Sequence, residues 1–259
     1  MGELQSIDPL IILQPLIVLL FSFGFVVYWR YRRSFTRAVL PYSLVAYAGA
    51  IALKYLIQIP TAAWIVKSFG ATSLPFSMYL GLQTVVFEVG GAFLVARYAV
   101  SRSKLESSDA EAFGIGLAFW ENGVLLGALP FINLVASYVL LVSNLSGPLA
   151  SQISNSQPAF FYPPRQALTL VAWGTLERIS SLLAHFSWGY LTVLSATFRK
   201  WRYLMIALPM GLLDALVPFA RGMSVPVFES LIFTLTLGFL LVALAVTWRI
   251  RKQIRWSPT

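Results

Sequence analysis

The chain has 259 residues, of which 58% are hydrophobic and 11% charged, and its mean hydropathy is +0.75. This composition excludes an ordinary soluble domain and predicts an all-α, polytopic transmembrane helical bundle, because several apolar runs reach the roughly 20 residues needed to cross a bilayer core. The net charge of +9 is concentrated at the ends of these runs, so we expect no nucleic-acid partner, and the absence of cysteine excludes disulfides and thiolate metal sites.

About seven membrane spans are predicted in chain order. They cover roughly residues 10–29, 39–59, 76–97, 111–142, 167–198, 203–220 and 226–248. The two longest have about 32 residues, which exceeds the thickness of a bilayer, so they must tilt, bend or project. The longest connection, residues 143–166, is rich in Ser, Asn, Pro and Gly and is either a mobile link or a lid.

The distribution of basic residues predicts the orientation. Fourteen of the nineteen lysines and arginines fall into four clusters, at residues 30–37, 97–104, 199–202 and 249–255. If 111–142 is a single span, all four clusters lie on the cytoplasmic side, whereas a hairpin around Pro130 would move the last two outside. The positive-inside rule therefore favours one span there, with the N-terminus out and the C-terminus in. We expect residues 1–259 to form a single integral-membrane helical domain in the cell membrane.

The segment from Trp173 to Arg199 is apolar enough to cross a membrane, yet it carries adjacent charges and the one histidine of the chain. Arg178, Ser181 and His185 are spaced i, i+3, i+7 and share one face of a helix, with Glu177 on its flank. A charge at the bilayer centre costs about 2.5–3.5 kcal/mol even on insertion scales, so these groups indicate a functional site.

Acidic residues are predicted near the middle of four separate spans. Counting from the span ends places each about 15–18 Å deep. They are Glu88, Glu121, Glu177 and Asp214. The sequence therefore predicts that four carboxylates from four helices converge near the bilayer midplane.

Lys54 and Arg178 are the cations at similar depth, so two negative charges stay uncompensated if all four acids are ionised. A divalent metal would neutralise them, as would protonation of two carboxylates. The first alternative predicts a metalloenzyme, and the second a proton-coupled carrier or an inert buried network. Simpler roles also stay open: Glu88 as the partner of Lys54, His185 bonded to a carbonyl of another helix, and Glu177 with Arg178 as a structural pair bonded to other helices.

Four stretches resemble the motifs of one known family, in the same order. Residues 86–100 (VFEVGGAFLVARYAV) are similar to an F-E-E-x-x-R segment, with Phe87 and Glu88 in place, and residues 114–123 (GIGLAFWENG) to G-x-G-x-G-x-x-E, with Glu121 in place. Residues 208–218 (LPMGLLDALVP) are similar to H-x-x-x-D, with Asp214 in place. The string LERISSLLAHFSWGYLTVLS around His185 completes the set. These motifs are those of the YhfC family of intramembrane metalloproteases, related to the CAAX-protease and bacteriocin-processing group, and the resemblance covers about residues 80–220.

Ala118 stands at the third glycine of the pattern, and three further positions depart from it. Val89 stands at the second glutamate, Ala92 at the arginine and Met210 at the second histidine. A zinc site needs three or four nitrogen or oxygen ligands with an open position, so one histidine must here serve together with carboxylates.

The resemblance implies a hydrolytic site inside the membrane. It implies Glu121 and His185 as ligands of a divalent metal, with zinc the expected ion, and Asp214 as a further ligand or orienting group. It also implies Glu88 or Glu177 as the general base that takes a proton from the attacking water.

The remaining implications concern Arg178, the substrate and the function. Arg178 would hold the base or stabilise the developing oxyanion. The substrate would be a peptide bond of a transmembrane or membrane-associated polypeptide, with membrane lipid around the protein. Two other functions stay open: a catalytically degenerate relative that acts as a membrane scaffold or binding subunit, and a proton- or cation-coupled carrier.

Overall fold

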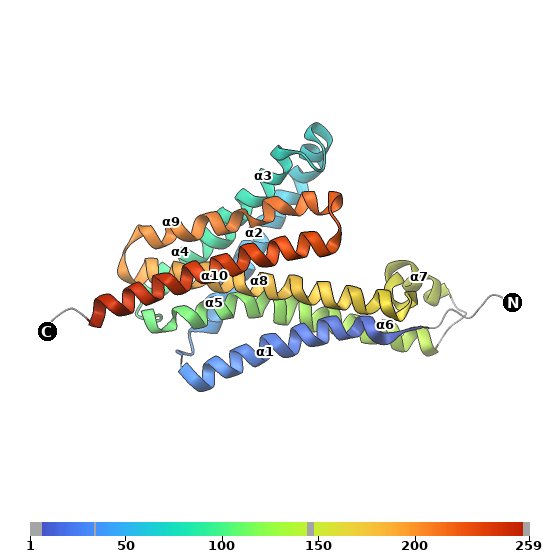
Figure 1. Cartoon of the computed structure of the whole chain (residues 1–259), viewed down its shortest axis with the longest axis horizontal. Coiled ribbons are helices and arrows are strands. Elements are labelled where there is room, and N and C mark those ends of the chain that lie inside the picture. Colours follow the sequence, from blue (N-terminus) through green and yellow to red (C-terminus); the bar gives the residue numbers. More distant parts are fainter. Residues whose placement is uncertain (1–6, 34, 144–147, 256–259) are drawn as a thin grey trace.

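Long helices that run side by side build the protein (Figure 1). The computed structural model describes residues 7–33, 35–143 and 148–255, and every element assigned within them is a helix. Six helical segments are long and apolar enough to cross a membrane, which confirms the all-α membrane bundle. They are Pro9–Arg32, Val39–Phe69, Leu74–Ser101, Ser107–Ser143, Trp201–Gly222 and Val225–Ile250.

The first two predicted spans are both found as helices. A short 3-10 helix, η1 (Pro9–Ile12), begins at Asp8, whose side chain accepts a hydrogen bond from the Leu10 amide, and it leads into α1 (Leu13–Arg33). Helix α2 (Val39–Phe69) extends about ten residues beyond the predicted span, with Pro60 inside it.

The next two spans are long rods, each interrupted by a π-helical stretch. The first rod consists of α3 (Leu74–Gln83), the π-helix η2 (Thr84–Gly90) and α4 (Gly91–Ser101). The second consists of η3 (Ser107–Asp109), α5 (Ala110–Ala118), the π-helix η4 (Phe119–Ala128) and α6 (Leu129–Ser143). Because the second rod is continuous through Pro130, the hairpin alternative is wrong and the single segment is confirmed.

The predicted long connection is largely helical. It contains α7 (Pro148–Ser156) and the 3-10 helix η5 (Pro158–Phe161). Ile153 and Phe160 pack there with Leu134 and Leu141 of α6, so this segment has a small apolar core of its own.

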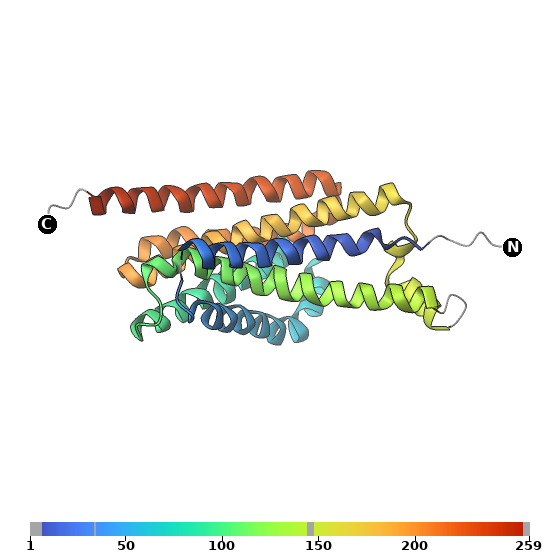
Figure 2. The same ribbon diagram turned by 90° about the horizontal axis from the view of Figure 1, so that it is seen from below.

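Helix α8 (Pro164–Phe198) lies at the centre of the bundle. It packs against α5, α10, α4 and α1, and most of the residues in its second half are buried. Gly114 of α5 and Gly189 of α8 allow these two helices to approach closely, because a Cβ at Gly189 would lie 2.6 Å from the Cα of Gly114. Figure 2 shows α10 along one edge of the bundle and α2 along the other, with α8 between them.

Two further long helical segments complete the described chain. Helix α9 (Trp201–Ala207) continues into the 3-10 helix η6 (Leu208–Gly222), and α10 (Val225–Arg255) follows. Helix α8 is not among the six apolar segments but runs alongside them. The described chain begins at one end of the bundle and finishes at the other, as an odd number of spans requires (Figure 1). The count of seven and the orientation stay predictions.

Candidate metal centre

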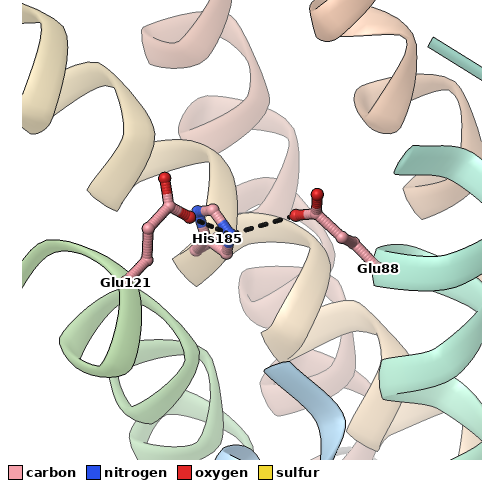
Figure 3. A group of neighbouring side chains, drawn as sticks. All are labelled: Glu88, Glu121 and His185. Atoms are coloured by element: carbon pink, nitrogen blue, oxygen red, sulfur yellow. Dashed lines mark ion pairs between the residues drawn. The ribbon is translucent and has the colours of Figure 1, made fainter. Parts of the chain in front are cut away.

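Three side chains from three helices meet in the middle of the bundle. His185 Nε2 lies 2.8 Å from Glu121 Oε2 and 3.3 Å from Glu88 Oε2 (Figure 3). One ligand atom of each residue lies within 4.8 Å of the other two, which is the spacing of groups that could hold one metal ion. Glu88 and His185 are buried, and the Glu121 side chain is 17% exposed.

Both glutamates lie on the π-helical stretches, Glu88 on η2 and Glu121 on η4. A π-helix hydrogen-bonds i to i+5, so one extra residue is accommodated and the following side chains turn to a new face. Glycine permits this winding in η4, because a Cβ at Gly127 would lie 2.6 Å from the carbonyl oxygen of Asn122. The local winding thus directs the carboxylates toward α8.

The imidazole of His185 is oriented by its own helix. Its Nδ1 lies 2.9 Å from the carbonyl oxygen of Ser181, and since a carbonyl only accepts, we assign the ring proton to Nδ1. Trp188, with ring centroids 4.5 Å apart, and Tyr47, at 6.3 Å, pack against the ring. In this tautomer Nε2 presents a lone pair.

That assignment determines what fits between the three groups. Nε2 has no hydrogen-bond partner of suitable geometry among the described residues, although Glu121 is at 2.8 Å. A lone pair and two carboxylate oxygens that face one another repel unless a cation lies between them. One imidazole with two carboxylates is a donor set that suits a divalent metal, and catalytic zinc sites use such mixed nitrogen and oxygen ligands. The residues present therefore fit the metal that the sequence predicts.

Further side chains hold Glu121 in place. The Ser181 hydroxyl donates to Glu121 Oε1 at 3.1 Å, and the Asn122 amide donates to the Ser181 oxygen at 3.1 Å. Arg178 Nη1 lies 3.5 Å from the same carboxylate oxygen, and its other terminal nitrogen bonds to Glu177. Glu177 and Arg178 thus bond to each other. Of the two, Arg178 is the one that also contacts a charged group of another helix among the described residues.

Lys54 of α2 binds the carboxylate on the opposite side. Its Nζ lies 2.5 Å from Glu88 Oε1 and 3.1 Å from Asp214 Oδ2, and it donates to Thr84 Oγ1 at 2.9 Å. The pairing of Glu88 with Lys54 is thus confirmed, although Glu88 also faces His185. Asp214, on η6, accepts from Lys54 and Thr84 and is not part of the three-residue group.

These contacts form one continuous network. In order it runs Asp214, Lys54, Glu88, His185, Glu121, Arg178 and Glu177. The predicted convergence of four carboxylates with two cations is therefore found. With a neutral imidazole, the four acids exceed the two cations by two negative charges.

A cavity of about 220 Å³ lies beside this network. Glu177 and Arg178 line it, and the Glu177 side chain is 47% exposed. Sequence reasoning missed another acid there, Glu229 of α10, which is 8% exposed and has one carboxylate oxygen without a hydrogen-bond partner in the described chain. A lone acid in an apolar run was the available signal, but its place near the start of the predicted span concealed its depth.

The three ligand-motif positions that the sequence predicts to be apolar substitutions occupy the hydrophobic core. Val89 and Ala92 are 0% and 1% exposed, and Met210 is 3% exposed. Apolar packing, not a polar network, therefore surrounds these positions.

Comparison with known proteins identifies the family of the chain. No match was found among curated proteins or solved structures. The model of one family, described as YhfC intramembrane metalloprotease, matches residues 17–225, which is most of the chain. The protein therefore belongs to the YhfC intramembrane metalloprotease family.

Proposed function

We propose that this integral membrane protein is a metal-dependent peptidase that hydrolyses a peptide bond of a membrane polypeptide, with the cell membrane as its location. The proposal is carried by the meeting of Glu88, Glu121 and His185 inside an apolar bundle, with an imidazole lone pair facing two carboxylates. These three residues would hold the ion, and zinc suits such ligands. A divalent ion held there supplies a Lewis acid for the water nucleophile and the scissile carbonyl.

The remaining residues of the network have positioning and proton-transfer roles. Glu177 is the group best placed to act as general base, because its side chain is half-exposed and lines the cavity. It accepts a proton from the attacking water and returns it to the leaving amine. Arg178 fixes this carboxylate and places positive charge where the oxyanion develops.

Asp214 is an orienting group in this proposal. Through Lys54 it stabilises the position of Glu88, which lies on the far side of the same ammonium group. Glu88 thereby serves as a ligand, and the alternative role of general base is left to Glu177.

The substrate must reach the cavity in an unwound form. An intact transmembrane helix hides its carbonyls in its own hydrogen bonds, so a segment that is cleaved has to expose at least one peptide group. A transmembrane or membrane-associated polypeptide with a locally weak helix fits this requirement.

A second candidate function is supported by the ion pairs themselves. Lys54 and Arg178 already bind the two candidate ligands Glu88 and Glu121, and a proton on His185 would satisfy the rest. Such a network needs no metal and suits a catalytically degenerate relative that acts as a membrane scaffold or binding subunit.

Metal analysis and a cleavage assay on the same samples separate the two functions. We expect detergent-purified wild type to contain a stoichiometric divalent metal, and Glu121→Gln and His185→Ala to lose it. When the protein is reconstituted with a library of transmembrane peptides, Glu177→Gln should keep the metal and lose the fragments seen by mass spectrometry. Wild type without metal, and without a change in melting temperature when zinc is added, would favour the scaffold.

A further inference from the structure

A second pocket, of about 540 Å³, lies away from the metal centre, where α4 meets the turn between α8 and α9. This is the end of the bundle at which α10 also finishes (Figure 1), and the basic clusters predict it to be cytoplasmic. Its lining includes Phe93, Arg97 and Ser101 of α4, Ser195 near the end of α8, Arg199 in the turn, and Trp201 at the start of α9.

The two arginines of this pocket come from basic clusters about a hundred residues apart in the sequence. The packing of α4 against α8 brings Arg97 and Arg199 into one cavity. Within the described part of the chain, no acidic side chain lines this cavity, and neither arginine has a carboxylate within 4.0 Å. Two like charges that share a cavity without a counter-charge favour an anion between them.

The backbone conformation at Arg199 is unusual for a residue other than glycine. Arg199 ends α8 in the left-handed conformation, with φ 54° and ψ 33°, where glycine is the usual residue. The turn is fixed by the Ser195 hydroxyl, which donates to the carbonyl oxygen of Lys200 at 3.1 Å. An arginine here carries a conformational cost that a guanidinium aimed at a ligand would justify.

The aromatic residues place the pocket at the depth of lipid headgroups. Trp201 is 59% exposed and contacts Phe93, with ring centroids 5.5 Å apart. Tryptophan at a helix end is typical of the membrane–water boundary. Basic pockets between membrane helices on the cytoplasmic side suit the phosphates of anionic lipids, and the planar guanidinium donates two parallel hydrogen bonds to phosphate oxygens.

We propose that the pocket between Arg97 and Arg199 is a binding site for a phosphate group, with the headgroup of an anionic phospholipid as the source that its depth favours. A free phosphate would be recognised by the same guanidinium groups. The site does not depend on the function of the metal centre.

Binding is measured by native mass spectrometry of the full-length protein in detergent, with phosphatidylglycerol or phosphatidylcholine added at equal concentration. We expect wild type to retain phosphatidylglycerol in preference to phosphatidylcholine. Arg97→Gln and Arg199→Gly should each lower the ratio of the two bound lipids about tenfold, because each removes a charge-assisted contact. Arg199→Gly keeps a residue suited to the left-handed backbone, so its melting temperature should not fall.

The control is Arg249→Gln, which removes an exposed positive charge at the same end of the bundle but outside the pocket. It should bind as wild type does. A separate titration with inorganic phosphate alone, followed by melting temperature, identifies the source: a rise abolished in Arg199→Gly, without any lipid preference, would support the phosphate site and assign it to the free ion. Equal lipid retention in all four proteins, with no response to phosphate, would overturn the proposal.

Discussion

His185 Nε2 lies 2.8 Å from Glu121 Oε2, while the other ring nitrogen of this histidine lies 2.9 Å from the carbonyl oxygen of Ser181. The carbonyl fixes the tautomer, and the tautomer turns a lone pair toward a carboxylate. In the proposed metal site a divalent ion lies between these two acceptors, so groups that orient the pair should control metal affinity.

Ser181→Ala should weaken metal binding by about 10–100-fold, the usual effect of removing a group that orients a ligand. The Ser181 hydroxyl donates to Glu121 Oε1 and accepts from Asn122, so its loss frees the carboxylate to rotate. Affinity is measured by competition with a fluorescent chelator. The matched control is Ser180→Ala, whose hydroxyl donates to the Leu176 carbonyl of its own helix and has no other hydrogen-bond partner among the described residues. Equal affinities in the two variants would contradict the proposed ligand role of Glu121.

Lys54→Met should destabilise the metal-free protein by about 3–5 kcal/mol, because it leaves buried carboxylates without their partner. The ammonium group bridges Glu88 and Asp214 and is 13% exposed. Unfolding in a denaturant titration gives the free energy. Adding Asp214→Asn to this variant should recover part of the loss, since one of the unpaired charges is then removed. Lys67→Met, at the exposed end of α2, is the control and should change little.

Gly114→Ala should separate α5 from α8. A Cβ at Gly114 would lie 2.5 Å from the carbonyl oxygen of Phe186, which cannot move without its helix. We expect a loss of about 1–3 kcal/mol of stability. Metal affinity should fall as well, because Glu121 follows α5 and His185 lies on α8. Gly238→Ala, with no atom within 4 Å of the new Cβ, should leave both measurements unchanged.

Glu229→Gln should stabilise the protein by about 1 kcal/mol, because an amide costs less to bury than a carboxylate with an unpartnered oxygen. This acid is 8% exposed, and one of its oxygens has no hydrogen-bond partner among the described residues. The melting temperature tests this, with Glu177→Gln as the control that should not stabilise, since it breaks the pair with Arg178. A decrease for Glu229→Gln would mean that its carboxylate binds a group outside the described protein contacts.

The sequence was sufficient to predict depth. Hydrophobic runs mark where each helix enters the bilayer, and a fixed rise per residue converts position into distance from the membrane surface. Glu88, Glu121 and Asp214 could therefore be placed at one level, and the network confirms that they meet there. The histidine and arginine of α8 followed from helical spacing along an uninterrupted helix.

Rotation about the helix axis could not be predicted in the same way. Glu88 and Glu121 lie on π-helical stretches and Asp214 on a 3-10 helix, so the angle of about 100° per residue does not hold at these positions. The family resemblance accordingly left two choices open, Asp214 as a ligand or an orienting group and Glu88 or Glu177 as the base. The distances place Glu88 beside His185 and Asp214 beside Lys54. A hydropathy profile does not distinguish π-helical and 3-10 segments from an ordinary α-helix.

The winding of η6 also sets a length. At about 2.0 Å per residue its fifteen residues extend to roughly 30 Å, whereas the same residues in an α-helix would extend to about 22 Å. Over the six steps from Leu208 to Asp214, the difference between 120° and 100° per residue adds up to about a third of a full turn. The tighter coil thus makes this short segment long enough to cross a membrane and directs its acid toward Lys54. An ordinary α-helix of this sequence would turn that acid away from the lysine.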